Sequence, residues 1–316
     1  MEHVVAVDLG GTTMKGGLVA RDGTILHAER RPTPRAEGPA AVIAAVSAFV
    51  TALAERHPTP APGPVPGPAS GLVPGPAPGS APGSAPRAVG LVVPGLVTPA
   101  RAVFSAAFGW RDVPAEAFTD VDLPVALGHD VRAAGEAELA HGLPGDAPSG
   151  DVLFVPIGTG IAGAVALSGS LYGGASGWAG QIGHIPVRPG GLPCGCGQRG
   201  CLSAYASAGA VAARCGETSA EEVLRRVRRG DAHARQVWDD AVEALALALA
   251  TYTLLLDPEL VVVGGGLSLA GPALIGPLRD RLAARLAFRR PPRVRASRLG
   301  PDAGLLGAAL LAWRAT

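Results

Sequence analysis

The sequence predicts a two-domain α/β protein. Its 316 residues correspond to about two domains, and the 48% apolar content is enough for a core in each. Short apolar runs alternate with segments of helical periodicity, and glycine-rich turns follow three of the predicted strands. The 27 basic and 26 acidic residues give a net charge of +1, which argues against a nucleic-acid partner and favours a small-molecule substrate.

The first domain is expected over residues 1–112. Apolar runs bounded by turn residues predict strands at 4–9, 14–20, 24–33 and 88–93. Apolar positions at helical spacing predict a helix over 38–56. Between that helix and the last strand, residues 57–87 are almost entirely Pro, Gly, Ala and Ser, a composition that predicts a disordered surface insertion.

The second domain is expected over residues 113–298, followed by a C-terminal helix within 299–316. Strands and helices alternate here, which is typical of a sheet with parallel strands. Strands are predicted at 125–128, 152–157, 162–167, 260–263 and 293–297. Helices are predicted at 131–141, 219–229 and 232–256, the second opening with Ser219 and Glu222 at capping-box spacing.

No membrane segment is expected. The N-terminus lacks the pattern of a secretory signal, and the longest apolar run, residues 244–256, is well below the roughly 18 residues that span a bilayer. We therefore expect a soluble, cytoplasmic protein.

The loop after the first strand has the composition of a phosphate site. Glycine allows backbone N–H groups to approach phosphate oxygens, hydroxyls donate to them, and a carboxylate can hold Mg²⁺. The candidate residues are Asp8, Gly10, Gly11, Thr12, Thr13 and Lys15. An ordinary Gly-Gly hairpin has the same pattern, so this loop alone does not decide between the two interpretations.

Two further glycine loops favour the nucleotide interpretation. Gly158, Thr159 and Gly160 lie between two predicted strands of the second domain, and Gly264, Gly265 and Gly266 follow another strand. Three such loops at strand ends in two domains predict a nucleotide in the cleft between the domains. Lys15 is the only lysine of the chain, which fits a phosphate contact.

A cluster of soft ligands predicts a metal site. His184, Cys194, Cys196 and Cys201 place one imidazole and three thiols within 18 residues. Such a set suits a closed tetrahedral Zn²⁺ site with a structural role, in a compartment that keeps thiols reduced. The alternative is free buried cysteines beside a coincidental histidine. Cys215 is left over and is expected to pack in the core.

These motifs together resemble the ROK (repressor, open reading frame, kinase) sugar kinases over nearly the whole chain. The Cys194–Cys201 stretch matches the zinc signature of that family, and the other matches are the three glycine loops and the segments 90–95, 109–110, 180–184, 256–259 and 302–307. The resemblance implies the actin-like ATPase (ribonuclease H-like) fold, with ATP and Mg²⁺ in the interdomain cleft and a sugar beside the zinc. It also implies a C-terminal helix packed on the first domain and a dimer as the default oligomer.

The resemblance implies that Asp130 is the general base for the sugar hydroxyl. A carboxylate at a strand-to-helix junction is kept ionised by the helix dipole, although a lone Asp at this place can also be a simple helix cap. His184 would bind zinc through one ring nitrogen and a sugar hydroxyl through the other.

Four sugar-contact positions depart from the family pattern. Where the family has Asn, Glu and Glu, this chain has His129, Gln181 and Ser203, and an Asn common before Gly109 is replaced by Ala107. Losing two carboxylate acceptors changes which hydroxyls the site can bind. The expected function is therefore a kinase for the primary hydroxyl of a hexose, glucose or a modified sugar such as an amino sugar or cyclitol.

Two alternatives remain open. One is a sugar- or nucleotide-binding protein without turnover; a DNA-binding repressor is not expected, because the phosphate loop begins at Asp8 and leaves no room for a helix-turn-helix. The other is polyphosphate as the phosphoryl donor, since the first loop resembles that branch of the family as well as the ATP branch.

Overall fold

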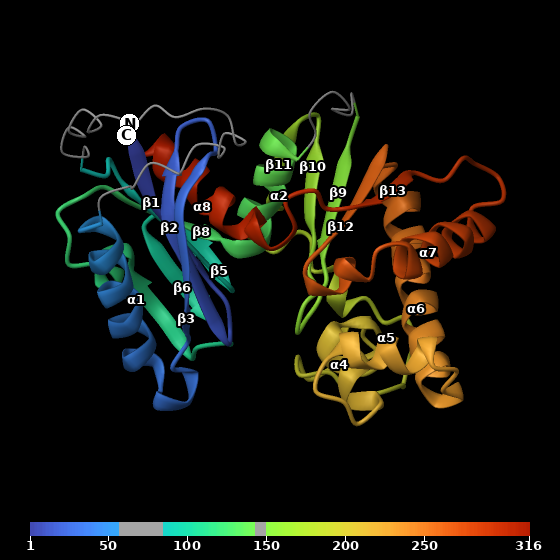
Figure 1. Cartoon of the computed structure of the whole chain (residues 1–316). Helices are drawn as coiled ribbons and strands as arrows, with labels where there is room; N and C mark the ends of the chain where they lie inside the picture. The colour runs from blue at the N-terminus through green and yellow to red at the C-terminus, as the bar shows by residue number, and fades with distance from the viewer. Residues whose placement is uncertain (57–84, 143–149) are drawn as a thin grey trace, which may run out of the picture. The chain divides into compact units, whose positions relative to one another are not determined.

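A computed structural model describes residues 1–56, 85–142 and 150–316 of the chain. The predicted insertion at 57–87 lies outside the described residues except for its last three. The chain divides into two compact units, Met1–Ala134 with Gly304–Thr316, and Gly135–Ala303. The elements of both are labelled in Figure 1.

The first unit is built on a five-stranded sheet of order β3-β2-β1-β4-β8. Its strands are β1 (His3–Leu9), β2 (Thr13–Ala20), β3 (Ile25–Pro32), β4 (Val89–Val93) and β8 (Val125–His129). The first three form an antiparallel meander, whereas β1, β4 and β8 run parallel. All five residues of β4 are buried, as expected for a central strand covered on both faces.

Two helices cover the two faces of this sheet. Gly16 of β2 lies against Phe49 and Leu53 of α1 (Pro39–Ala54), and Gly90 of β4 lies against α8 (Ala303–Arg314). Gly16 and Leu91 both lie opposite Val7 in the neighbouring strands, so the three share one face of the sheet. Side chains alternate along a strand, so Gly90 lies on the opposite face. The 3-10 turn η1 (Arg35–Glu37) precedes α1.

The predicted boundary between the domains, after residue 112, is wrong. Strand β8 pairs in parallel with β4, from Val89 opposite Val125 to Val93 opposite His129, so it completes the sheet of the first unit. The chain leaves that unit only within α2 (Asp130–His141). The strand itself was predicted, but its partner lies far back in the chain, and a local pattern does not identify it.

A small three-stranded sheet in the first unit was not predicted. It consists of β5 (Leu96–Thr98), β6 (Arg101–Ser105) and β7 (Trp110–Pro114), followed by the 3-10 turn η2 (Ala115–Phe118). Its strands are short and β5–β6 contains a register shift, which removes the periodicity that would reveal them. Trp110 packs between the tilted rings of Phe108 and Phe118, and its Nε1 donates to the carbonyl of Pro39, so this sheet is anchored to α1.

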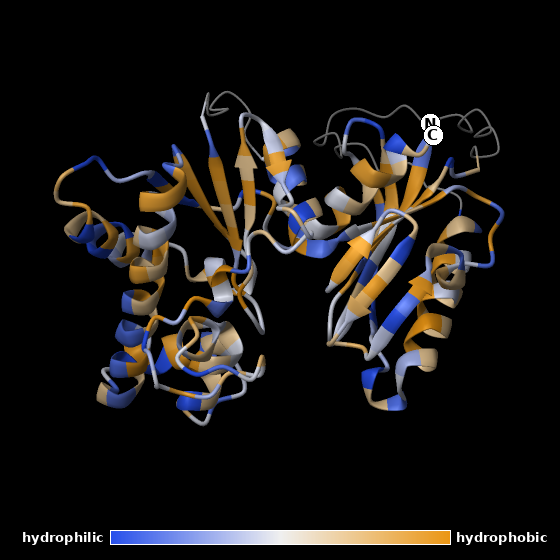
Figure 2. Ribbon diagram, turned by 180° about the vertical axis from the view of Figure 1, so that it is seen from behind, coloured by the Kyte–Doolittle hydropathy of each residue, from blue (hydrophilic) through white to orange (hydrophobic). Residues whose placement is uncertain are grey.

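The second unit contains a five-stranded sheet of order β11-β10-β9-β12-β13. Its strands are β9 (Val152–Pro156), β10 (Ala164–Leu167), β11 (Ser170–Tyr172), β12 (Leu260–Gly264) and β13 (Arg293–Ala296). Helices α3 (Ser203–Ala206), α4 (Ala208–Arg214), α5 (Ala220–Arg228), α6 (Ala232–Leu256) and α7 (Pro272–Arg285) belong to this unit, with the 3-10 turns η3 (Ile182–His184), η4 (Gly266–Ala270) and η5 (Gly300–Asp302). Figure 2 shows apolar residues concentrated along the strands of both sheets.

The predicted helix boundaries of the second unit have identifiable caps. The Ser219 hydroxyl accepts a hydrogen bond from the Glu222 N–H at 3.2 Å, which confirms the predicted start of α5. Asp231 caps α6 in the same way through the Ala234 N–H at 2.9 Å, and α6 ends where Asp257 turns left-handed at φ 48°. Among the described helices, none has both the length and the apolar character that crossing a bilayer requires.

Candidate active site

The first glycine loop is a tight hairpin at the exposed end of β1 and β2. The Gly10 N–H donates to the Thr13 carbonyl at 3.0 Å, and Thr12 and Thr13 are exposed. A side chain at Gly11 would meet nothing within 4 Å, so the space beside the loop is open to a ligand. The structure therefore leaves the backbone and hydroxyls of this loop accessible, as a phosphate site requires.

Thr33 braces this loop and was not predicted as a site residue. Its hydroxyl donates to the Gly10 carbonyl at 2.8 Å, and its N–H donates to the Thr12 carbonyl at 3.0 Å. Thr33 directly follows β3, the last strand of the meander. A hydroxyl at the end of a strand has no local sequence pattern that would indicate this contact.

Asp8 is packed between β2 and the first turn of α8. It lies opposite Lys15 in the β1–β2 register. A Cβ on Gly304 would come within 2.1 Å of its Oδ2, so only glycine permits this approach. Burial, and then the nearby charge of Asp130, raise the pKa of Asp8 to about 7, while Lys15 lowers it.

This raised pKa predicts a stability that depends on pH. Between pH 3.8 and about 7 the folded chain binds more protons at Asp8 than the unfolded chain, so this contribution to the free energy of unfolding falls as the pH rises and levels off above 7. Asp8→Asn should stabilise the protein free of Mg²⁺ and nucleotide at pH 8 by about 2–4 kcal/mol, and the gain should vanish near pH 4. Urea denaturation at both pH values measures this.

The exposed carboxylate of Asp122, in the same unit, provides the control. Asp122→Asn should leave the free energy of unfolding nearly unchanged at either pH. An Asp8→Asn protein no more stable than the wild type at pH 8 would show that ionisation of Asp8 does not destabilise the free protein.

His129 and Asp130 lie where β8 ends and α2 begins. Nδ1 of His129 accepts the Arg132 N–H at 3.4 Å, so the histidine, not the aspartate, caps the helix. Burial, and then the positive charge of Arg132, lower the pKa of His129, which the charge of Asp130 only partly offsets. Burial therefore disfavours the charged form of this ring.

The side chain of Asp130 remains accessible. It is 28% exposed, its Oδ1 lies 3.3 Å from Nδ1 of His129, and the same oxygen accepts the Val131 N–H at 2.8 Å. Among the described residues, no hydrogen bond involves its Oδ2. The alternative interpretation of Asp130 as the helix cap is not supported, since His129 occupies that role.

The two glycine loops of the second unit lie next to each other. The Ile157 N–H donates to the Gly264 carbonyl at 3.0 Å, and the Ile157 carbonyl accepts the Leu267 N–H at 3.1 Å. Gly265 has φ +73° and a Cβ there would clash with Ile157, so this approach requires glycine. Side chains at Gly158 and Gly160 would meet nothing within 4 Å, which again leaves open space beside the backbone.

A hollow of about 590 Å³ adjoins the second of these loops. Gly266, Leu267 and Leu269 line it on one side, and Leu224 and Arg228 of α5 line it on another. Its walls are largely apolar with arginine among them, which suits a flat heterocycle that carries a polar edge. No local pattern of the sequence indicates this hollow, because its walls come from segments far apart in the chain.

The four predicted metal ligands come together in the second unit. The ligand atoms of His184, Cys194, Cys196 and Cys201 lie within 4.8 Å of one another. Sγ of Cys194 is 3.8 Å from Nδ1 of His184, and Sγ of Cys196 is 3.7 Å from Sγ of Cys201. Three thiols and an imidazole at this spacing fit one tetrahedral Zn²⁺ ion and leave no open position on it.

Two predicted sugar contacts lie beside this cluster. Gln181 precedes η3, which ends at His184, and the His184 N–H donates to the Gln181 carbonyl at 3.0 Å. Ser203 is close to the same turn, since a Cβ on Gly183 would come within 2.4 Å of its Oγ. With Nδ1 of His184 directed at the cysteines, its Nε2 is the ring nitrogen left for another partner.

Each unit therefore assembles its own part of the predicted site. Asp8, the first loop, His129 and Asp130 belong to the first unit, whereas the other two loops, the metal cluster, Gln181 and Ser203 belong to the second.

Comparisons with known proteins show the family of the chain. The sequence profile of the ROK family matches residues 4–61 and 80–315. The chain is 33% identical to a glucokinase of Thermotoga maritima, over 97% of this chain and 96% of that protein. It is also 33% identical to an N-acetylmannosamine kinase of Escherichia fergusonii, over 98% and 97% of the two chains.

Among solved structures, a ROK family glucokinase from Streptomyces griseus in complex with glucose and AMPPNP superposes with a TM-score of 0.80. It is 27% identical and the match covers 99% of both chains. The fold of this chain is thus that of the ROK sugar kinases, the actin-like ATPase fold that the motifs predicted.

Proposed function

Since the chain belongs to the ROK family, we propose that it is a sugar kinase that transfers the terminal phosphoryl group of ATP to a hydroxyl of a hexose or an amino sugar. The observation that carries this is the nearly full-length identity of about a third to two kinases of different sugars. The accessible carboxylate of Asp130 also supports it, because the reaction needs a group that accepts the proton of the attacking hydroxyl.

Asp130 is proposed as the general base. Its Oδ2 would accept the proton of the attacking hydroxyl, while the bond between Oδ1 and the Val131 N–H fixes the carboxylate. The neutral ring of His129 would donate from Nε2 to a neighbouring oxygen of the sugar. Phosphoryl transfer requires mainly positioning and charge neutralisation, and these residues provide the positioning.

The three glycine loops are proposed to hold the nucleotide. Backbone N–H groups and the hydroxyls of Thr12 and Thr13 would contact phosphate oxygens, together with Lys15 and the Gly158–Gly160 loop. Bound Mg²⁺ would neutralise the developing charge, and Asp8 is the carboxylate placed to hold it. The hollow beside Gly265 and Gly266 suits the base of the nucleotide.

We propose that the cysteine cluster binds a structural Zn²⁺ ion. The ion would stabilise the loop that carries His184, and through its Nδ1 contact it would set Nε2 as the donor toward the sugar. Gln181 and Ser203 would complete the sugar contacts. Thiolate ligands require a reducing compartment, which we propose is the cytoplasm.

A homodimer is proposed as the oligomeric state. Three leucines of α6 are exposed, Leu247, Leu254 and Leu255, and Phe288 beyond α7 is 81% exposed. Apolar side chains of this size at the surface are typical of a self-association face. Light scattering of the purified protein measures the state directly.

Release of ADP coupled to a panel of sugars tests the proposed function. With Mg-ATP, at least one hexose or amino sugar should raise ADP release well above the sugar-free rate. A sugar other than glucose should be preferred, because Gln181 and Ser203 stand where the family has two carboxylate acceptors. Replacing ATP by polyphosphate in the same assay tests the alternative donor. The proposal fails if no hexose, amino sugar or cyclitol of the panel is turned over with either donor.

A further inference from the structure

Glu138 of α2 is the single acidic side chain that is fully buried among the described residues. It is 1% exposed and lies on a helix stripe that is otherwise apolar, with Ala133, Ala134 and Ala137. A buried carboxylate is costly unless its oxygens are fully paired. Its partners therefore explain why it is there.

All the partners of Glu138 come from one short segment. Oε1 accepts the Arg298 N–H at 3.0 Å and lies 3.2 Å from the Arg295 guanidinium. Oε2 accepts the Ser297 hydroxyl at 2.8 Å and the Leu299 N–H at 3.4 Å. The carboxylate thus fastens α2 to the residues that follow β13.

These two segments lead to the two places where the chain changes units. The first crossing lies between Ala134 and Gly135, just before Glu138, and the second between Ala303 and Gly304, just after the segment that Glu138 binds. On the side of the first unit, α2 touches α8, which follows the second crossing, since a Cβ on Gly307 would lie 2.3 Å from the backbone of Ala133. The two crossings are therefore tied together on both sides.

Each tied segment also leads to a proposed active-site carboxylate. Asp130 is the first residue of α2, two turns before Glu138. Gly304, in the first turn of α8, lies against the carboxylate of Asp8. A helix is stiff along its axis, so a loose attachment at Glu138 would make the orientation of Asp130 less defined. It would do the same for Asp8, through the segment that leads to Gly304.

We propose that Glu138 is a positioning residue of the kinase, which fastens the two crossings and thereby fixes the orientations of Asp130 and Asp8 during phosphoryl transfer. This inference rests on the proposed function. It goes beyond that function because Glu138 touches neither the predicted phosphate loops nor the predicted sugar contacts.

Steady-state kinetics of Glu138→Gln tests the proposal. Glutamine keeps the shape but cannot accept at both oxygens, so the fastening loosens. At a temperature well below the melting transition we expect kcat to fall about 10- to 100-fold while the KM values for ATP and for the sugar change less than about threefold. Ser297→Ala, which removes one hydrogen bond to Glu138 and one from the Gly300 N–H, should lower kcat by a smaller factor and remains informative if Glu138→Gln does not fold.

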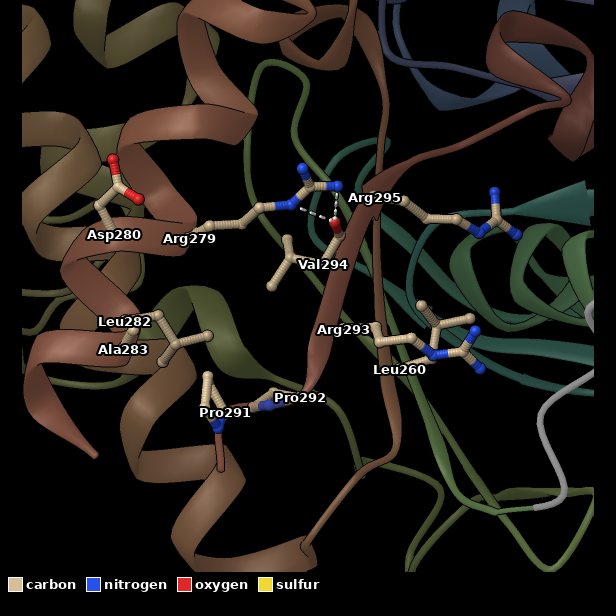
Figure 3. Close-up of a pocket in the computed structure, with 10 residues that line it drawn as sticks. All are labelled: Leu260, Arg279, Asp280, Leu282, Ala283, Pro291, Pro292, Arg293, Val294 and Arg295. Carbon is tan, nitrogen blue, oxygen red and sulfur yellow. Dashed lines mark hydrogen bonds between the residues drawn. The ribbon is translucent and has the colours of Figure 1, made fainter. Parts of the chain in front are cut away.

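Arg279 supplies the matched control. Its Nε donates to the Val294 carbonyl at 2.8 Å, and Figure 3 shows Arg279 on the α7 side of β13 and Arg295 on the other side. Arg279→Gln therefore removes contacts from the same strand without touching Glu138. It should lower the melting temperature while leaving kcat within about twofold of the wild type.

Hydrogen exchange gives a readout independent of turnover. Glu138→Gln should speed amide exchange at residues 130–134 and 303–308, which lie in or next to the first unit, whereas Arg279→Gln should not. Equal kcat and equal exchange in the two variants would make Glu138 merely structural and overturn this inference while the proposed function stands. A wild-type protein without turnover on any sugar would overturn both.

Discussion

Replacing Asp130 by Asn should lower kcat for the sugar by about a thousandfold. Asparagine keeps the shape of the side chain and its contact with the Val131 N–H, but it cannot accept the proton of the attacking hydroxyl. Binding of the sugar should change only a few-fold, because binding and turnover depend on different properties of this group. Coupled ADP release gives kcat, and calorimetry of the sugar with the inactive variant gives the binding constant.

Glu136 on another face of the same helix is the control for this substitution. Glu136→Gln changes a carboxylate of α2 without changing the end of the helix, so kcat should stay within about twofold of the wild type. Turnover that survives in Asp130→Asn would remove the general-base role. Turnover that is lost there and present in the wild type would exclude a binding protein without catalysis.

Loss of the proposed zinc should have the largest effect on stability. Cys201 is fully buried, and burial, followed by the neighbouring thiols, raises its pKa to about 12, so its thiolate needs a cation beside it. Cys201→Ser should yield protein without zinc that melts at least about 10 °C lower, because removing a structural metal ion costs several kcal/mol. Metal analysis and thermal denaturation measure the two effects.

Cys215 is the matched cysteine outside the cluster. It is buried at the C-terminal end of α4 and is not one of the four clustered residues, so Cys215→Ser should retain one zinc per chain and lose little of its melting temperature. Wild-type protein that contains no zinc when purified without chelator would contradict the metal site. Equal destabilisation in the two variants would do so as well.

The features that the sequence predicted well are local ones. Asp8 and the glycines that follow it lie within a single hairpin, and the cysteine cluster spans 18 residues, so the chain itself brings these groups together. The predicted cap of α5 likewise depends on residues three apart. In each case the physical cause and the pattern occupy the same short stretch.

The features that were missed depend on contacts across the chain. Gly304 approaches Asp8 from nearly 300 residues away, and Glu138 is paired with residues 295–299. A signal for Glu138 did exist, since a carboxylate at a helix position otherwise occupied by buried alanines predicts a buried partner. Its partner could not be predicted, because nothing in α2 indicates which distant strand end lies beside it.

Strand β13 ends the second sheet, and such an outer strand exposes backbone groups to which another polypeptide could add. Here Arg279 occupies the Val294 carbonyl with two of its N–H groups, while Arg293 and Arg295 of the same strand are ion-paired with Glu259 and Glu138. Strand addition by a neighbouring molecule would have to displace the Arg279 guanidinium from that carbonyl. This contact therefore makes the outer strand a poor template for aggregation through the sheet.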